Sequence, residues 1–137
     1  MFISISDRGK CYFFGGYGSG GKMSQVINVT EYAAAIDSNH TSYSFSAWLG
    51  GYGSQNDRST VSLTFLNNTQ QMIGIQITIG PVVASDRGSV TKFLYRSQSG
   101  LVPVNTRYLD VQLTADRSYG TSNDGYADNI AVIFNHL

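Results

Sequence analysis

The stretch TVSLTFL, residues 60–66, decides the fold class, because apolar and polar side chains alternate along it. Val61, Leu63 and Phe65 are separated by threonine and serine. A strand with one buried face and one wetted face has this period of two. The stretch IGIQITI, residues 73–79, repeats the pattern with isoleucine at every second position. We expect its four isoleucines to point into one core: Ile73, Ile75, Ile77 and Ile79.

The same period continues outside these two stretches. YSFSAWL (43–49) and YLDVQLTA (108–115) also alternate, and less regular strands are expected at about residues 10–15, 23–29, 90–97 and 127–135. Only residues 30–38 predict a helical turn. About eight antiparallel strands in one domain, residues 1–137, predict an all-β antiparallel β-sandwich, a jelly roll.

Composition excludes several classes of function. The 137 residues carry no net charge, and only 13% of them are charged. Nucleic-acid binding would call for a basic balance, and membrane insertion for an apolar run of about 20 residues. We expect neither.

The N-terminus lacks the features of a signal peptide, and Cys11 is the only cysteine. We therefore expect a cytoplasmic location or leaderless export. Three Asn-x-Thr sequons, at Asn28, Asn39 and Asn67, matter only if the chain meets the secretory pathway, and we interpret them as chance matches.

Loops between consecutive antiparallel strands alternate between the two ends of a sandwich. Four loops are therefore predicted to share one end: 15–22, 50–58, 81–89 and 116–126. The loops predicted at the other end are 30–41, 67–70 and 98–103. The first end carries both copies of the sequence GGYGS, residues 15–19 and 50–54, and three of the four Asp-Arg pairs in the chain.

These loops carry the residue types that bind sugars. Carboxylates accept hydrogen bonds from hydroxyl groups, guanidinium and amide groups donate them, and aromatic rings stack on the apolar face of a sugar. The predicted acceptors are Asp57, Asp86, Asp116 and Asp124. The predicted donors are Arg58, Arg87, Arg117, Asn56 and Asn123, and the predicted stacking residues are Tyr52 and Tyr119. The alternative is that each aspartate forms an ordinary turn with a solvated arginine beside it.

The acidic residues also suit calcium, which prefers oxygen ligands. Asp124 and Asp128 are close in sequence and are the candidate metal ligands, although the spacing does not match an EF-hand. We expect no cofactor to be required, with Ca²⁺ as the candidate metal.

Catalysis has little support in the sequence. Glu31 is the only glutamate and falls at the opposite end, and both histidines lie away from the acidic loops. No nucleophile elbow or zinc spacing is present. We expect the protein not to be an enzyme.

Four stretches resemble a known class of module: YSFSAWLGGYGSQNDRSTVSLTFLNN (43–68), GPVVASDR (80–87), GLVPVNTRYLDVQLTADR (100–117) and SNDGYADNIAVIF (122–134). They are similar to the galactose-binding-domain-like β-sandwiches, which include many carbohydrate-binding modules and lectins. The resemblance covers about residues 12–135. It implies a jelly roll that binds sugars through its loops or concave face, often beside a structural calcium. The Asn-Gly-x-Phe-Glu strand that usually opens the class, and whose acidic residue helps to hold the metal, is missing here.

Together, these observations favour a small non-catalytic lectin that binds glycoconjugates through the loops of one end. Single sites of this kind are weak, so we expect a homo-oligomer, with the strand face around Trp48 as candidate interface. The alternative is a structural or adhesion module that binds a protein partner.

Overall fold

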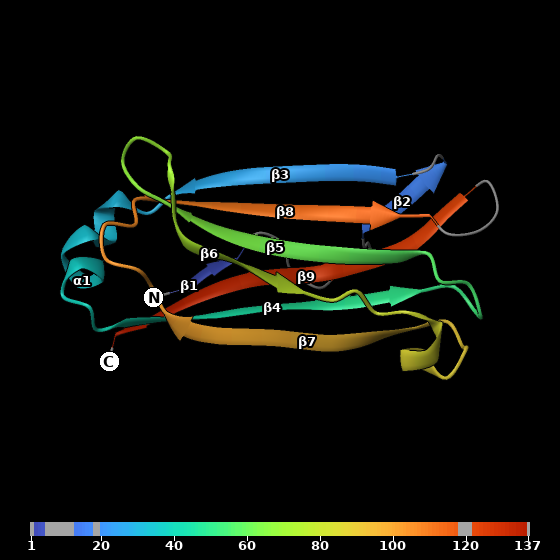
Figure 1. Ribbon diagram of the computed structural model, residues 1–137. Helices are drawn as coiled ribbons and strands as arrows, with labels where there is room; N and C mark the ends of the chain where they lie inside the picture. The colour runs from blue at the N-terminus through green and yellow to red at the C-terminus, as the bar shows by residue number, and fades with distance from the viewer. Residues whose placement is uncertain (1, 5–12, 18–19, 118–121, 137) are drawn as a thin grey trace.

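The computed structural model describes residues 2–4, 13–17, 20–117 and 122–136. These residues form strands and three short helical segments, drawn in Figure 1. The strands are β1 (Phe2–Ser4), β2 (Phe13–Tyr17), β3 (Gly20–Asn28), β4 (Thr41–Gly51), β5 (Arg58–Leu66), β6 (Met72–Ile79), β7 (Lys92–Leu101), β8 (Tyr108–Asp116) and β9 (Ser122–His136). The helical segments are η1 (Thr30–Tyr32), α1 (Ala33–Asp37) and η2 (Ala84–Arg87).

The strands make two sheets that pack face to face. One sheet has the order β1–β9–β4–β7, with β2 also paired to β9, and the other has the order β3–β8–β5–β6. All of these pairs are antiparallel. From β2 to β5, and again from β6 to β9, strands that are consecutive in the sequence lie in opposite sheets, as in a jelly roll. The predicted antiparallel β-sandwich is confirmed, as is the helical turn within residues 30–38.

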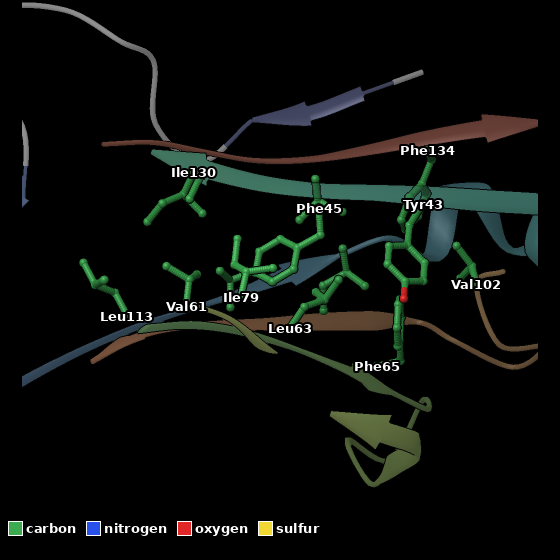
Figure 2. Packing of buried hydrophobic residues seen from close by; sticks show 14 of the residues in the cluster. Tyr43, Phe45, Val61, Leu63, Phe65, Ile79, Val102, Leu113, Ile130 and Phe134 are labelled. Atoms are coloured by element: carbon green, nitrogen blue, oxygen red, sulfur yellow. The ribbon is translucent and has the colours of Figure 1, made fainter. Parts of the chain in front are cut away.

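The core lies between the two sheets and comes from the alternating residues of the central strands. Phe45 and Leu49 of β4 are fully buried, and so are Val61 and Leu63 of β5. Figure 2 shows Phe45 projecting from one sheet toward Val61 and Leu63 of the other. The ring centroids of Tyr43 and Phe65 lie 5.2 Å apart across the core. The period of two in the sequence is therefore the alternation between the core and the outer faces.

Ile75 is an exception that corrects the sequence prediction. Ile79 is buried, but Ile75 is 77% exposed. The pairing of β5 with β6 shifts register between Leu63 and Phe65, whose partners are Ile77 and Ile73, so β6 carries extra residues there. Gly74, at a φ of 69° that disfavours other residues, lies inside this bulge. The bulge breaks the alternation and leaves Ile75 in solvent on an edge strand.

None of the helices within the described residues is long and apolar enough to cross a membrane.

The packing predicts different costs for two aliphatic truncations. Leu63→Ala removes fully buried methyl groups and should lower the free energy of unfolding by about 2 to 5 kcal/mol. Ile75→Ala, the matched control at the exposed bulge, should change it by less than about 0.5 kcal/mol. Urea denaturation measures both values, and similar losses in the two variants would contradict the assigned core.

Candidate functional site

Two of the four loops predicted to share one end of the sandwich do so in the structure, and the other two include residues outside the described part of the chain. The β4–β5 loop (52–57) and the β6–β7 loop (80–91), which contains η2, lie at the end opposite α1 (Figure 1). β8 also ends there, at Asp116. We call the 52–57 and 80–91 loops together the loop end.

Arg87 joins these two loops from inside. Its side chain is fully buried. Nη1 donates to the carbonyl oxygens of Gly53 (3.0 Å) and Val90 (2.9 Å), and Nη2 donates to that of Gln55 (2.8 Å). Burial lowers the pKa of the Arg87 guanidinium, an effect that Tyr126 and Asp86 oppose, yet arginine remains charged at any physiological pH. A buried cation therefore holds the 52–57 loop by two of its carbonyl groups.

Two further hydrogen bonds connect the same loops. The Gly53 amide donates to Thr91 Oγ1 at 2.8 Å, and the Ala84 amide donates to Asn56 Oδ1 at 3.0 Å. Within the 80–91 loop, Asp86 Oδ2 accepts from the Val83 amide at 2.9 Å. The loop end is therefore one connected unit rather than two independent turns.

The packing of Arg87 requires the glycine at position 51, in the second GGYGS sequence. A methyl group there would lie 2.8 Å from Arg87 Nη2 and 3.0 Å from the carbonyl oxygen of Asp57. Only a residue without a side chain admits the guanidinium at this distance. The first copy has a different setting, since Gly15, Gly16 and Tyr17 belong to β2. The predicted 15–22 loop is thus shorter than expected, and residues 18–19 lie outside the described part of the chain.

Burial corrects two of the predicted sugar-binding residues. Asp57 and Arg87 are both fully buried, so neither side chain can reach a ligand in this structure. The Asp86-Arg87 pair differs from the solvated turn of the alternative interpretation, because Arg87 is buried and donates to loop carbonyl groups. We therefore replace the predicted donor role of Arg87 with a structural one.

The remaining predicted residues of the two loops do face solvent. Tyr52 is 54% exposed. Asn56 and Asp86 are also exposed, each with one oxygen engaged in the loop hydrogen bonds described above. Arg58 is half-buried, and its Cα pairs across β5 and β8 with that of the exposed Asp116.

The other predicted residues fall directly after β8 or on β9, or lie between these strands in the sequence. Arg117 is half-buried. Tyr119 lies outside the described residues, as do the side chains of Asn123 and Asp124, whose backbone belongs to β9. The sugar-binding roles of these four residues stay predictions.

The calcium hypothesis gains no support from the described residues, and the side chain of Asp124, one of its two candidate ligands, lies outside them. Positions 124 and 128 lie four residues apart on β9, which is roughly 13 Å in an extended strand. Two oxygens on one calcium ion lie within about 5 Å of each other. Asp128 is buried, and its Oδ1 accepts a hydrogen bond from the Asn129 amide at 2.8 Å. Within the part of the chain that the structure describes, no group of three or more His, Cys, Asp or Glu side chains is placed to hold a metal ion.

Aromatic side chains gather on the outer face of the β9–β4–β7 sheet, a feature that the sequence indicated only at Trp48. Trp48 alternates with the buried Ala47 and Leu49, so it points away from the core. Its cross-strand partner is Tyr95, 50% exposed, with ring centroids 5.5 Å apart. The sequence does carry one signal for Tyr95. It lies two residues after Phe93 on β7, so the two aromatic side chains share one face of the strand.

Comparison with known proteins supports the fold. No protein-family model and no curated protein sequence matches the chain. Among solved structures, the chain is similar to a family 16 carbohydrate-binding module, with a TM-score of 0.60, 17% identity, and coverage of 96% of this chain and 84% of the module.

Two larger proteins contain a similar domain. The bacteriophage CBA120 tailspike protein 4 matches with a TM-score of 0.56 and 15% identity over 88% of this chain, which spans 14% of the tailspike chain. The VP2 subviral particle of infectious bursal disease virus matches with a TM-score of 0.58 and 13% identity over 99% of this chain, which spans 32% of that chain. At these identities the likeness establishes the fold: a β-sandwich of the kind found in a carbohydrate-binding module and in viral proteins.

The Arg87 hydrogen bonds predict a large stability effect at one arginine. Arg87→Ala would leave the carbonyl groups of Gly53, Gln55 and Val90 without their donor, so unfolding should become easier by about 3 kcal/mol or more. Arg96→Ala is the matched control, since Arg96 Nη1 bonds only to the carbonyl of the adjacent Tyr95 within the described residues. The control should change the free energy of unfolding by less than about 0.5 kcal/mol. Equal denaturation midpoints for the two variants would contradict the role of Arg87.

Proposed function

We propose that this protein is a non-catalytic carbohydrate-binding module whose ligand contacts the loop end. The observation that carries the proposal is the buried Arg87, which fixes two solvent-facing loops before any ligand arrives. A preorganised site loses less conformational entropy on binding than two mobile loops would.

The exposed groups of the loop end match the chemistry of a sugar. Tyr52 offers an exposed aromatic ring, and rings of this kind stack against the apolar face of a pyranose. Asn56 and Asp86 add amide and carboxylate groups, which pair with hydroxyls. Arg58 and Asp116 extend this set toward β5 and β8. The likeness to a carbohydrate-binding module, which covers most of both chains, supports the same class of ligand.

The proposed site needs no metal. Its candidate residues act through hydrogen bonds and ring stacking, which require no metal ion. Binding should therefore survive a chelator.

A second candidate function is that of a structural module that binds protein, including further copies of itself. The outer-face pair Trp48–Tyr95 favours it, because aromatic residues are enriched in protein interfaces. The likeness to a subviral particle protein favours it too. Self-association through this face would also raise the avidity of weak sugar sites.

A glycan array with and without a calcium chelator separates the two functions, and a titration then locates the site. Tyr52→Ala should weaken binding of the selected soluble oligosaccharide roughly fivefold or more, since an aromatic stacking contact contributes about 1 kcal/mol. Tyr95→Ala is the control, because it removes an equally exposed tyrosine from the sheet face. Calorimetry with a monovalent sugar excludes avidity effects.

The outcomes are distinct. A loss in Tyr95→Ala but not in Tyr52→Ala would move the site to the outer sheet face and contradict the loop end. Absence of sugar binding under both conditions, together with concentration-dependent self-association in sedimentation that Tyr95→Ala abolishes, would favour the structural function.

A further inference from the structure

The end of the sandwich opposite the loop end contains a pocket that the sequence did not indicate. Asn67 and Asn68 of the β5–β6 turn line it, together with Asn105 and Arg107 of the β7–β8 loop. These two segments lie at the α1 end of the molecule (Figure 1). The pocket has a volume of about 260 Å³, just below the roughly 300 Å³ at which pockets for drug-sized ligands begin. It therefore suits a ligand of the size of one sugar ring.

The walls of this pocket are fixed by hydrogen bonds that do not involve a ligand. Asn67 Oδ1 accepts from the Thr69 amide (3.0 Å), the Thr69 hydroxyl (2.8 Å) and the Gln71 amide (3.0 Å). Because the oxygen is fully engaged, the Asn67 side chain is held in place and its Nδ2 group is left to donate. The Asn105 backbone amide donates to Asp37 Oδ1 at 2.9 Å, which holds the other wall.

The charge of the pocket is balanced. Arg107 donates to both carboxylate oxygens of Asp37, at 3.1 Å from Nη1 and 2.5 Å from Nη2. These bonds, and that from the Asn105 amide, hold the pKa of the Asp37 carboxyl below its usual value, so the pair stays ionised at neutral pH. An anionic ligand would compete with Asp37 for Arg107, whereas a neutral ligand leaves the ion pair intact.

Among neutral ligands, the groups that line the pocket favour one that carries hydroxyl groups. Side-chain amides donate and accept hydrogen bonds, as hydroxyl groups do. The side chains of Asn68 and Asn105 make no hydrogen bond within the described residues, so they can turn to a ligand without breaking one. Neighbouring hydroxyls on one ring satisfy several such groups at once.

We propose that this pocket is a second saccharide site, specific for a neutral monosaccharide unit and independent of the loop end. The two sites lie at opposite ends of strands such as β5, whose nine residues span about 30 Å. One copy of the chain can then bridge two glycans without forming an oligomer.

The test titrates D-galactose, D-glucose and D-mannose separately into the isotope-labelled protein and follows the amide resonances of residues 67, 68 and 105. N-acetylneuraminic acid serves as the anionic comparison. Asn105→Gly removes one lining side chain and keeps the backbone conformation, since glycine tolerates its φ of 75°. Asn39→Gly is the matched control: Asn39 has a φ of 61°, is exposed, and does not line the pocket.

We expect at least one neutral sugar to shift the pocket resonances. Asn105→Gly should weaken that response roughly fivefold or more, the effect of losing one hydrogen bond, while Asn39→Gly and Tyr52→Ala leave it unchanged. Absence of a shift with all three sugars overturns the proposal, as does an unchanged response in Asn105→Gly. Tighter binding of the acid than of any neutral sugar overturns the assigned ligand class. Because Tyr52→Ala reports on the loop end alone, failure of either site leaves the result for the other readable.

Discussion

The burial of one guanidinium group determines the arrangement of the loop end. A charged side chain loses its hydration when it is buried, and it is tolerated only where hydrogen-bond acceptors replace the water. Arg87 meets this need at Nη1 and Nη2 with carbonyl groups from its own loop and from the 52–57 loop, while its buried Nε has no hydrogen-bond partner among the described residues. The same requirement explains the glycine at position 51, because a side chain there would occupy the space of the guanidinium. Loop order at this end therefore follows from the solvation of a single ion.

The two ends of the sandwich use the same strategy with different groups. At the loop end a buried cation holds backbone carbonyls, and exposed side chains are left for contact with a ligand. At the α1 end an ion pair between the half-buried Arg107 and the exposed Asp37, together with the saturated oxygen of Asn67, holds a small polar pocket. In both places the groups that fix the site differ from those that would bind. This separation lets a ligand bind without first ordering the loops, which is what weak, hydrogen-bonded recognition of sugars requires.

The sequence predicted the architecture well, because the period of two reports directly which residues face the core. From strand order alone it also predicted that the β4–β5 and β6–β7 loops share an end, since antiparallel connections alternate. It failed at Ile75, where a bulge with no sequence signal other than Gly74 reverses the alternation.

The candidate site was harder to predict for a physical reason. Residue type says whether a group can bind a sugar but not whether it is turned inward, and Asp57 and Arg87 are buried although their neighbours Asn56 and Asp86 are exposed. The pocket of Asn67 and Asn105 was missed because its walls come from two loops distant in sequence. The two loops are held close together by the backbone amide of Arg107, which donates to the Leu66 carbonyl. No local sequence pattern predicts such a contact.

Native-state hydrogen exchange tests the central claim, that Arg87 makes the two loops one rigid unit. The decisive amides are those of Gly53, which bonds to Thr91 Oγ1, and Ala84, which bonds to Asn56 Oδ1. If the account is right, both are protected to a similar degree, and in Arg87→Ala both lose protection together while Leu63 in the core keeps a higher protection than either. Rapid exchange at both amides in the unmodified protein, or loss of protection at only one of them in the variant, would contradict it.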